Sequence, residues 1–158
     1  YAAEGLNSIE NSFIEKIQRI KYKIDRGLGT DFLNYFNLGK VYLEFAKIIE
    51  GQKLIQQFYV NESIIHLEEA NKLKPNNLRI KSVLGESYLM LNKINESAEL
   101  FLYIIKEKKD DTNSLMKLAD CFYRIDDFEN LRKILSRVAL YSLKLENDEK
   151  LIVYQWIM

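Results

Sequence analysis

The stretch "INESAELF", residues 94–101, has the same pattern as "VNESIIHL", residues 60–67, and the two are separated by an interval of 34 in the numbering. Both segments contain Asn-Glu-Ser, both begin with a branched aliphatic residue, and both end on a large apolar residue. A match of this kind at a fixed interval indicates an internal repeat, in which each unit is one supersecondary element. The first question is therefore how far this period extends along the chain.

The period continues toward the C-terminus. Adding 34 to Leu84, Gly85, Tyr88 and Phe101 leads to four residues of matching character: Leu118, Ala119, Phe122 and Leu135. Toward the N-terminus, "YFNLGKVY", residues 35–42, matches residues 81–88, but at an interval of 46. The surplus over 34 predicts a 12-residue insertion between the two helices of the first repeat.

Apolar residues recur with a helical period over nearly the whole chain. One proline and six glycines, with almost no Val/Thr-rich alternation, argue against strands. Near the N-terminus Asn7 is a candidate helix cap, and a stripe from Ile9 to Ile24 follows at spacings of four and three. About eight helices are expected, over residues 7–27, 30–51, 53–73, 77–91, 94–108, 112–124, 127–144 and 148–158.

The second repeat has Leu84, Gly85 and Tyr88 on its first helix, then Ser97 and Phe101 on its second. In this spacing the chain resembles the tetratricopeptide repeat (TPR) family, whose 34-residue unit follows W-x2-L-G-x2-Y, then A-x3-F, then P. The resemblance implies an all-α, right-handed array of antiparallel helix pairs, a TPR-like α-solenoid with capping helices at both ends. About three degenerate repeats are covered.

The repeats also suggest how the chain is organised. At 158 residues it can bury a core without a disulfide or metal, so we expect one domain over residues 1–158. Its expected parts are an N-terminal capping helix (1–29), repeat 1 with the insertion (32–77), repeat 2 (78–111), repeat 3 (112–145), and a C-terminal capping helix or the start of a fourth repeat (146–158). Leu131 stands where a small residue is usual, so the third pair should be wider or shifted.

Charge and composition exclude several classes of function. Lys plus Arg and Asp plus Glu both number 23, so no global field attracts nucleic acid or anionic lipid. No apolar run reaches the ~18 residues of a membrane span, so no direct membrane insertion is expected. The compartment is left open between cytoplasm and, if a signal or lipid anchor precedes the sequence, periplasm or envelope. Lysine outnumbers arginine 17 to 6, which suggests an AT-rich genome and a bacterial source.

Catalytic and metal-binding signals are weak. His66 is the sole histidine, and although Glu69 lies three residues on, a metal site needs more ligands; a surface histidine on a helix is preferred. Cys121 follows a buried-type stripe and is interpreted as a core thiol. "GLGT", residues 27–30, lacks the lysine of a phosphate loop. We expect no enzyme, cofactor or metal, and only carboxylate-based chemistry is left open.

The resemblance implies a concave groove, lined by the first helix of each pair, that binds a peptide segment. The positions carried over are Phe36, Lys40, Leu43, Ser82, Glu86, Leu89, Met116, Asp120 and Tyr123. Members that hold chaperone C-terminal carboxylates have Lys and Asn where Phe36 and Lys40 stand, so a segment with apolar anchors fits better. The competing interpretation is that residues 150–158, the chain's own end, fill the groove.

The inserted hairpin, residues 44–60, is a second candidate surface. Ile48, Ile55 and Phe58 lie on two helix ends that project beyond the neighbouring pair. The preferred interpretation is that the N-terminal stripe covers them, and the alternative is that part of the tip stays exposed as a docking patch.

The function expected from the sequence is a non-catalytic interaction module or scaffold. It would bind a partner protein or peptide through the groove, the hairpin, or both, and a homodimer through the exposed hairpin is a further option. The alternative is a regulatory or scaffold part of an enzyme whose catalytic domain lies outside this chain. Nucleic-acid binding is disfavoured by the zero net charge.

Overall fold

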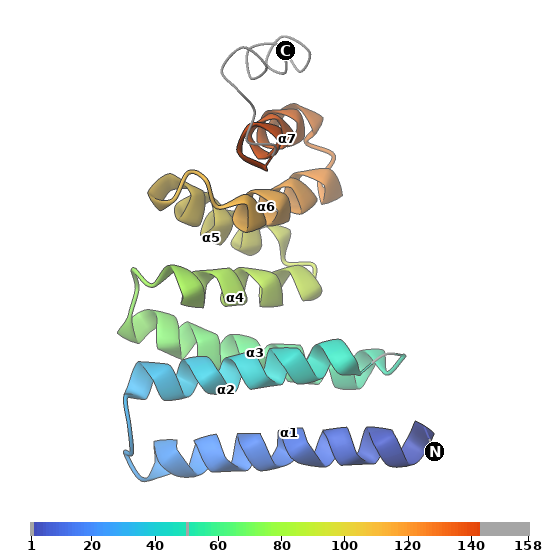
Figure 1. Ribbon diagram of the computed structural model, residues 1–158, viewed down its shortest axis with the longest axis vertical. Coiled ribbons are helices and arrows are strands. Elements are labelled where there is room, and N and C mark those ends of the chain that lie inside the picture. Colours follow the sequence, from blue (N-terminus) through green and yellow to red (C-terminus); the bar gives the residue numbers. More distant parts are fainter. Residues whose placement is uncertain (1, 50, 143–158) are drawn as a thin grey trace. The chain divides into compact units, whose positions relative to one another are not determined.

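The structure, a computed structural model, describes residues 2–49 and 51–142. Within these ranges it contains helices and no strands, which confirms the all-α prediction (Figure 1). The helices are α1 (Ala2–Asp25), α2 (Asp31–Ile48), α3 (Lys53–Leu73), α4 (Leu78–Met90), α5 (Ile94–Glu107), α6 (Thr112–Arg124) and α7 (Phe128–Ser142). The helix expected over 148–158 lies outside the described residues.

Most helix ends agree with the sequence pattern, and α3 and α6 begin and end at the predicted residues. The exception is α1, which begins at Ala2 and not at Asn7. Alanine and glutamate favour the helix strongly, so "AAEG" extends it past the expected cap.

The N-terminal caps of α4 and α6 lie one repeat period apart. The side chain of Asn77 accepts from Arg79 N at 3.0 Å, and that of Asp111 accepts from Ser114 N at 3.2 Å.

The turns between paired helices show the same period. Asn92 follows α4 and Asp126 follows α6, and both have φ of 57°. This left-handed region is strained for most residues, but Asn and Asp visit it because their short polar side chains bond locally. In the longer first pair, Gly51 takes a positive φ of 78°. The chain therefore reverses direction at equivalent positions with residues that tolerate the required backbone.

Two compact units make up the chain, residues 1–91 and 92–158. Unit 1 contains α1 to α4, and unit 2 contains α5 to α7 together with the residues that follow. The boundary falls between the two helices expected to form repeat 2. The single domain expected from the sequence stays a prediction.

Close packing of α2 against α3 depends on a glycine. A Cβ added at Gly39 would lie 2.5 Å from Cγ of Leu67 and 3.0 Å from the carbonyl oxygen of Ser63. The hydroxyl of Ser63 also donates a hydrogen bond to the carbonyl oxygen of Gly39 at 2.7 Å. The small residues at this crossing let the two backbones approach, as the repeat pattern predicts.

Successive helix pairs are joined by a second small-residue contact. In unit 1 the hydroxyls of Ser63 on α3 and Ser87 on α4 lie 3.1 Å apart. In unit 2 the thiol of Cys121 on α6 lies 3.7 Å from the hydroxyl of Ser97 on α5. Each member of the second contact stands one repeat period after its counterpart in the first, so the two units contain the same buried joint.

The insertion lengthens helices and does not add a loop. Helices α2 and α3 have 18 and 21 residues, whereas α4 and α5 have 13 and 14. The surplus of five in the first helix and seven in the second accounts for the twelve that the repeat spacing predicts. The far end of the α2–α3 hairpin, where Ile48 ends α2 and Lys53 begins α3, is therefore an extension of an otherwise ordinary pair (Figure 1).

The third pair departs from the pattern in α7. Leu135, the expected equivalent of the fully buried Phe101, is exposed, while Ile134 is buried. The buried face of α7 is thus displaced by one residue. Leu131, a bulky residue at the place of Ser97, accounts for this shift because a large side chain cannot occupy the tight crossing.

Candidate functional site

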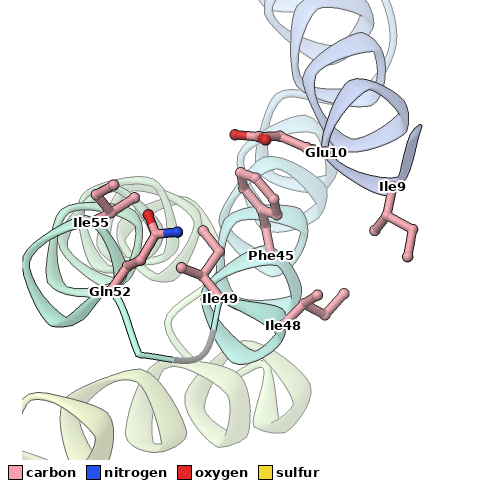
Figure 2. A pocket seen from close by; sticks show the side chains of 7 residues that line it. All are labelled: Ile9, Glu10, Phe45, Ile48, Ile49, Gln52 and Ile55. Carbon is pink, nitrogen blue, oxygen red and sulfur yellow. The ribbon is translucent and has the colours of Figure 1, made fainter. Parts of the chain in front are cut away.

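A cavity of about 240 Å³ opens at the tip of the α2–α3 hairpin (Figure 2). Three segments of unit 1 supply its lining: Ile9 and Glu10 from α1, Phe45, Ile48 and Ile49 from the end of α2, and Gln52 and Ile55 from the start of α3. Small-molecule pockets are usually about 300–1,000 Å³. This cavity is smaller and mainly apolar, so it suits a single protruding side chain better than a drug-sized ligand.

The N-terminal helix covers one side of the hairpin. The ring of Phe13 stacks on that of Phe45 with centroids 5.0 Å apart, and Ile17 packs in a cluster with Leu38 and Tyr42. This confirms the preferred prediction for the middle of the stripe. At its N-terminal end, however, Ile9 remains 45% exposed. The end of the stripe therefore lies at the cavity without closing it.

Large apolar side chains close in sequence to the cavity lining are exposed. Leu54 is 81% exposed and Phe58 is 57% exposed, and Ile48 and Ile55 in the lining are also exposed. These four residues and the cavity form the surface that we call the tip surface. Exposed apolar groups that gather in one place, with a polar surrounding, are typical of interaction sites. The tip is therefore packed against α1 on one side and exposed on another, and its use as a docking patch stays a prediction.

Of the described residues that line the cavity, Glu10 alone is charged. Within the described part of the chain it forms no ion pair. Figure 2 shows its side chain beside the ring of Phe45. Burial raises the pKa of the Tyr59 hydroxyl, and the negative charge of Glu10 raises it further. The carboxylate thus gives an otherwise apolar cavity a local negative potential.

A row of aromatic rings supports the hairpin behind the cavity. The imidazole of His66 lies between the rings of Tyr35 and Tyr42, with centroid distances of 6.2 and 5.6 Å. Burial lowers the pKa of His66, Glu62 at 3.7 Å raises it, and Lys21 lowers it. The expected surface histidine is thus a stacked, half-buried packing residue. Tertiary contacts with α1 and α2 place it there, which helical spacing alone does not specify.

The other chemically reactive candidates have structural surroundings. Glu69 pairs with Lys72 at 3.2 Å and not with His66. Cys121 is fully buried, burial raises the pKa of its thiol, and the thiol donates to Ser97. In the described ranges no three His, Cys, Asp or Glu side chains come together as metal ligands. No helix in those ranges combines the length and apolarity of a membrane span.

The groove positions of unit 1 are largely engaged in packing or ion pairs. Phe36, Leu43 and Leu89 are buried. Two charged positions have partners, since Lys40 lies 3.8 Å from Glu44 and Glu86 lies 2.7 Å from Lys47. Ser82 is half-buried. The accessible part of this face is thus small and polar.

The groove positions of unit 2 are more open. Met116 is exposed and Tyr123 is 64% exposed, while the guanidinium of Arg124 donates to both carboxylate oxygens of Asp120 at 3.0 and 2.9 Å. Residues 150–158, the proposed plug of the groove, lie outside the described residues. The structure therefore brings Met116 and Tyr123 to the surface of one helix, with an ion pair between them.

Sequence reasoning did not assign Glu10 or Gln52 to the site. Glu10 directly follows Ile9 in the N-terminal stripe, so once that stripe is expected to face the hairpin, its neighbour is a candidate for the hairpin tip. Gln52 caps the start of α3 without a side-chain hydrogen bond to that helix. Neither sequence feature identifies a cavity residue unless the packing of α1 on the hairpin is already known.

No protein-family model matches the chain, and no curated protein matches it in sequence. Solved structures with the same fold include the crystal structure of MamA, with a TM-score of 0.69 and 14% identity over 95% of this chain and 77% of that one. Another is MamA MSR-1, with a TM-score of 0.65 and 16% identity over 89% and 74% of the two chains. The fold is a TPR-like helical repeat. At these identities the likeness shows the fold alone.

Proposed function

We propose that this chain is a non-catalytic protein-interaction module that docks an apolar segment of a partner protein on the tip surface. The observation that carries the proposal is an open apolar cavity of about 240 Å³ at the end of a hairpin that is longer than its neighbouring pair. Exposed Leu54 and Phe58 lie beside it. A few buried apolar anchors supply most of the binding energy of typical interfaces, so a cavity with an apolar rim is suited to this role.

The packing beneath the tip supports the proposal. The ring of Phe45 forms part of the cavity and is fixed by Phe13 at 5.0 Å and Tyr59 at 4.6 Å. The side-chain amide of Gln56 donates to the carbonyl oxygen of Ala46 at 2.9 Å, which ties the start of α3 to the end of α2. A site on packed helices loses little conformational entropy on binding.

The groove positions of each unit are further candidate surfaces in this proposal. Those not buried are Lys40, Ser82 and Glu86 in unit 1, and Met116, Asp120 and Tyr123 in unit 2. The resemblance to tetratricopeptide repeats supports a peptide-binding role, and tyrosine, exposed here at Tyr123, is enriched in protein interfaces. The tip surface is preferred over the groove positions as the docking site because it contains a cavity.

The test compares variants of the tip in affinity capture from the source lysate. Ile55→Asp places a charge in the exposed part of the cavity lining, and Gln57→Asp places the same charge on a nearby exposed position of α3 that does not line the cavity. Circular dichroism and thermal unfolding establish that both variants fold. We expect Ile55→Asp to lose at least one partner that wild type and Gln57→Asp retain.

The groove is tested in parallel with Tyr123→Ala, whose exposed side chain leaves folding intact. A partner lost only in this variant would move the binding site from the tip to the groove. If the folded Ile55→Asp protein recovers every partner at the wild-type level, the tip surface is not a docking site.

A further inference from the structure

The tip surface contains a cavity and an exposed apolar side chain that is adjacent in sequence to the cavity lining. The cavity is lined by residues that include Phe45, Ile49 and Ile55. The exposed side chain is that of Leu54, which directly precedes Ile55 on α3. Leu54 is 81% exposed, so almost its whole side chain is in solvent. Two molecules related by a two-fold axis can each place Leu54 in the cavity of the other, because an isologous interface uses the same patch on both subunits.

The charges of the tip have the same self-complementary arrangement. Among the described residues that line the cavity Glu10 is the one with a charge, and Lys53 directly precedes Leu54. Neither side chain forms an ion pair within the described residues. When Leu54 of one molecule occupies the cavity of another, its chain neighbour Lys53 lies at the mouth of the cavity that Glu10 lines. The two-fold axis then repeats this pair of opposite charges.

The N-terminus of α3 also favours a carboxylate of a second molecule at the tip surface. Its first turn contains no acidic residue, and Gln52 provides no side-chain cap. The free N–H groups and positive dipole end of a helix are stabilised by a nearby negative charge. Glu10 of a second molecule would supply such a charge to this helix, whose first turn has no acidic residue among the described residues.

From these relationships we infer that the tip surface binds a second copy of this chain, with Leu54 of each copy in the cavity of the other and Glu10 paired with Lys53 across the interface. The inference rests on the proposed function, since it names the partner for the same surface. The second copy completes the site, because the cavity is filled by a residue that the partner contributes.

Sedimentation velocity of the full chain over a concentration series measures the association. We expect wild type to form a dimer, and Leu54→Asp to remain monomeric and folded, since Leu54 makes almost no contact within its own molecule. Gln57→Asp is the matched control and should dimerise like wild type. Charge reversal by Glu10→Lys or Lys53→Glu places like charges in both pairs of the dimer, so each variant should bind itself at least about tenfold more weakly.

Mixing the two charge variants provides the sharpest test. In a mixed dimer of one Glu10→Lys molecule and one Lys53→Glu molecule, both cross-interface pairs again join opposite charges, so the mixture should associate more tightly than either variant alone. The double variant Glu10→Lys/Lys53→Glu likewise has opposite charges in both pairs of its own dimer. Its self-association should return toward the wild-type level. Failure of the double variant to restore binding would contradict the pairing, and a Leu54→Asp protein that still dimerises would contradict the interface.

The dimer and the proposed docking function can fail separately. If wild type is monomeric up to about 1 mM, where even weak specific contacts are populated, the inferred dimer is wrong. In that case, loss of another protein by Ile55→Asp in the capture experiment would still support docking at the tip. If the double charge variant restores association, the second copy is established as the occupant.

Discussion

The hydroxyl of Ser63 lies 3.1 Å from the hydroxyl of Ser87, in a fully buried contact between α3 and α4. Unit 2 repeats this joint one repeat period later, with Ser97 and the thiol of Cys121 at 3.7 Å. The sole cysteine thus occupies the place of a serine in an internally repeated contact. Its role is to fit a small, weakly polar side chain between two helices.

This equivalence predicts that Cys121→Ser is tolerated, because it recreates the hydroxyl pair of unit 1. We expect the free energy of unfolding to change by no more than about 1 kcal/mol. Cys121→Leu should lower it by about 1–3 kcal/mol, since the joint has no room for extra methylene groups. Urea unfolding measures both. Equal destabilisation by serine and leucine would show that the two joints are not equivalent.

Gly39 should not tolerate even alanine. Its Cβ would lie 2.5 Å from Leu67 Cγ and 3.0 Å from a backbone oxygen, so α2 and α3 must separate. Alanine gains about 1 kcal/mol of helix propensity over glycine, but overpacking costs about 1–3 kcal/mol. The expected result of Gly39→Ala is a lower thermal midpoint.

Asn37→Ala, on the exposed side of the same helix, is the control for Gly39→Ala. It should leave the midpoint unchanged or slightly raised, because alanine is the better helix former and no neighbour is displaced. A midpoint at or above wild type in Gly39→Ala would refute the close approach of α2 and α3.

Phe13→Ala should loosen α1 selectively. The ring of Phe13 is 9% exposed and stacks on Phe45, so its removal costs about 3 kcal/mol. The neighbouring Ile14 is 37% exposed, and Ile14→Ala should have a much smaller effect. Amide hydrogen exchange measures the response in each helix. We expect faster exchange in α1 with α3 still protected, and equal effects of the two substitutions would contradict the packing.

The turn residues provide a backbone prediction. Asn92 and Asp126 both have φ of 57°, where glycine has no steric penalty. Asn92→Gly and Asp126→Gly should therefore preserve or slightly raise stability, whereas Asn92→Val should lower it by about 1–3 kcal/mol. Chemical denaturation of each variant separates these outcomes. Tolerance of valine at Asn92 would show that the turn does not need the left-handed conformation.

His66 should make stability depend on pH. Its pKa is lowered in the folded chain, chiefly by burial. Between that value and the ordinary value of about 6.5, the unfolded chain binds more protons, so the free energy of unfolding rises with pH. This contribution is fully present above pH ~6.5 and is lost as the pH falls through the ordinary and then the folded pKa.

The variant His66→Phe isolates the effect, because phenylalanine keeps a ring between Tyr35 and Tyr42 but does not titrate. Thermal unfolding from about pH 8 to pH 5 should show a larger loss of stability in wild type than in the variant. Parallel pH profiles, or a wild type that gains stability on acidification relative to the variant, would show that burial does not dominate at His66.

Local sequence was sufficient for the helices and their repeat. The ends of α3 and α6 were predicted from turn residues and the apolar period, and the caps Asn77 and Asp111 that the structure shows lie one period of 34 apart. The insertion was predicted from spacing alone, and the structure shows it as longer helices. These features depend on backbone preferences and on apolar periodicity, which neighbouring residues encode.

Local sequence did not predict which face of α7 is buried or what surrounds His66. Ile134, and not Leu135, is buried because a bulky Leu131 changes how α7 fits. His66 lies between two tyrosines because α2 and α3 bring their side chains together. Such outcomes depend on shape complementarity between elements, where a shift of one residue changes which side chain is enclosed.

By itself, the sequence determined that this protein is an all-α chain of repeated helix pairs with one lengthened hairpin, because helix propensity, turn chemistry and apolar period are local properties. Only the tertiary structure decided that α1 packs on the middle of that hairpin and lines the cavity at its tip without closing it. The stacking of Phe13 on Phe45 fixes where α1 lies, and therefore which apolar residues remain in solvent. The open cavity beside Leu54 is the result of that packing.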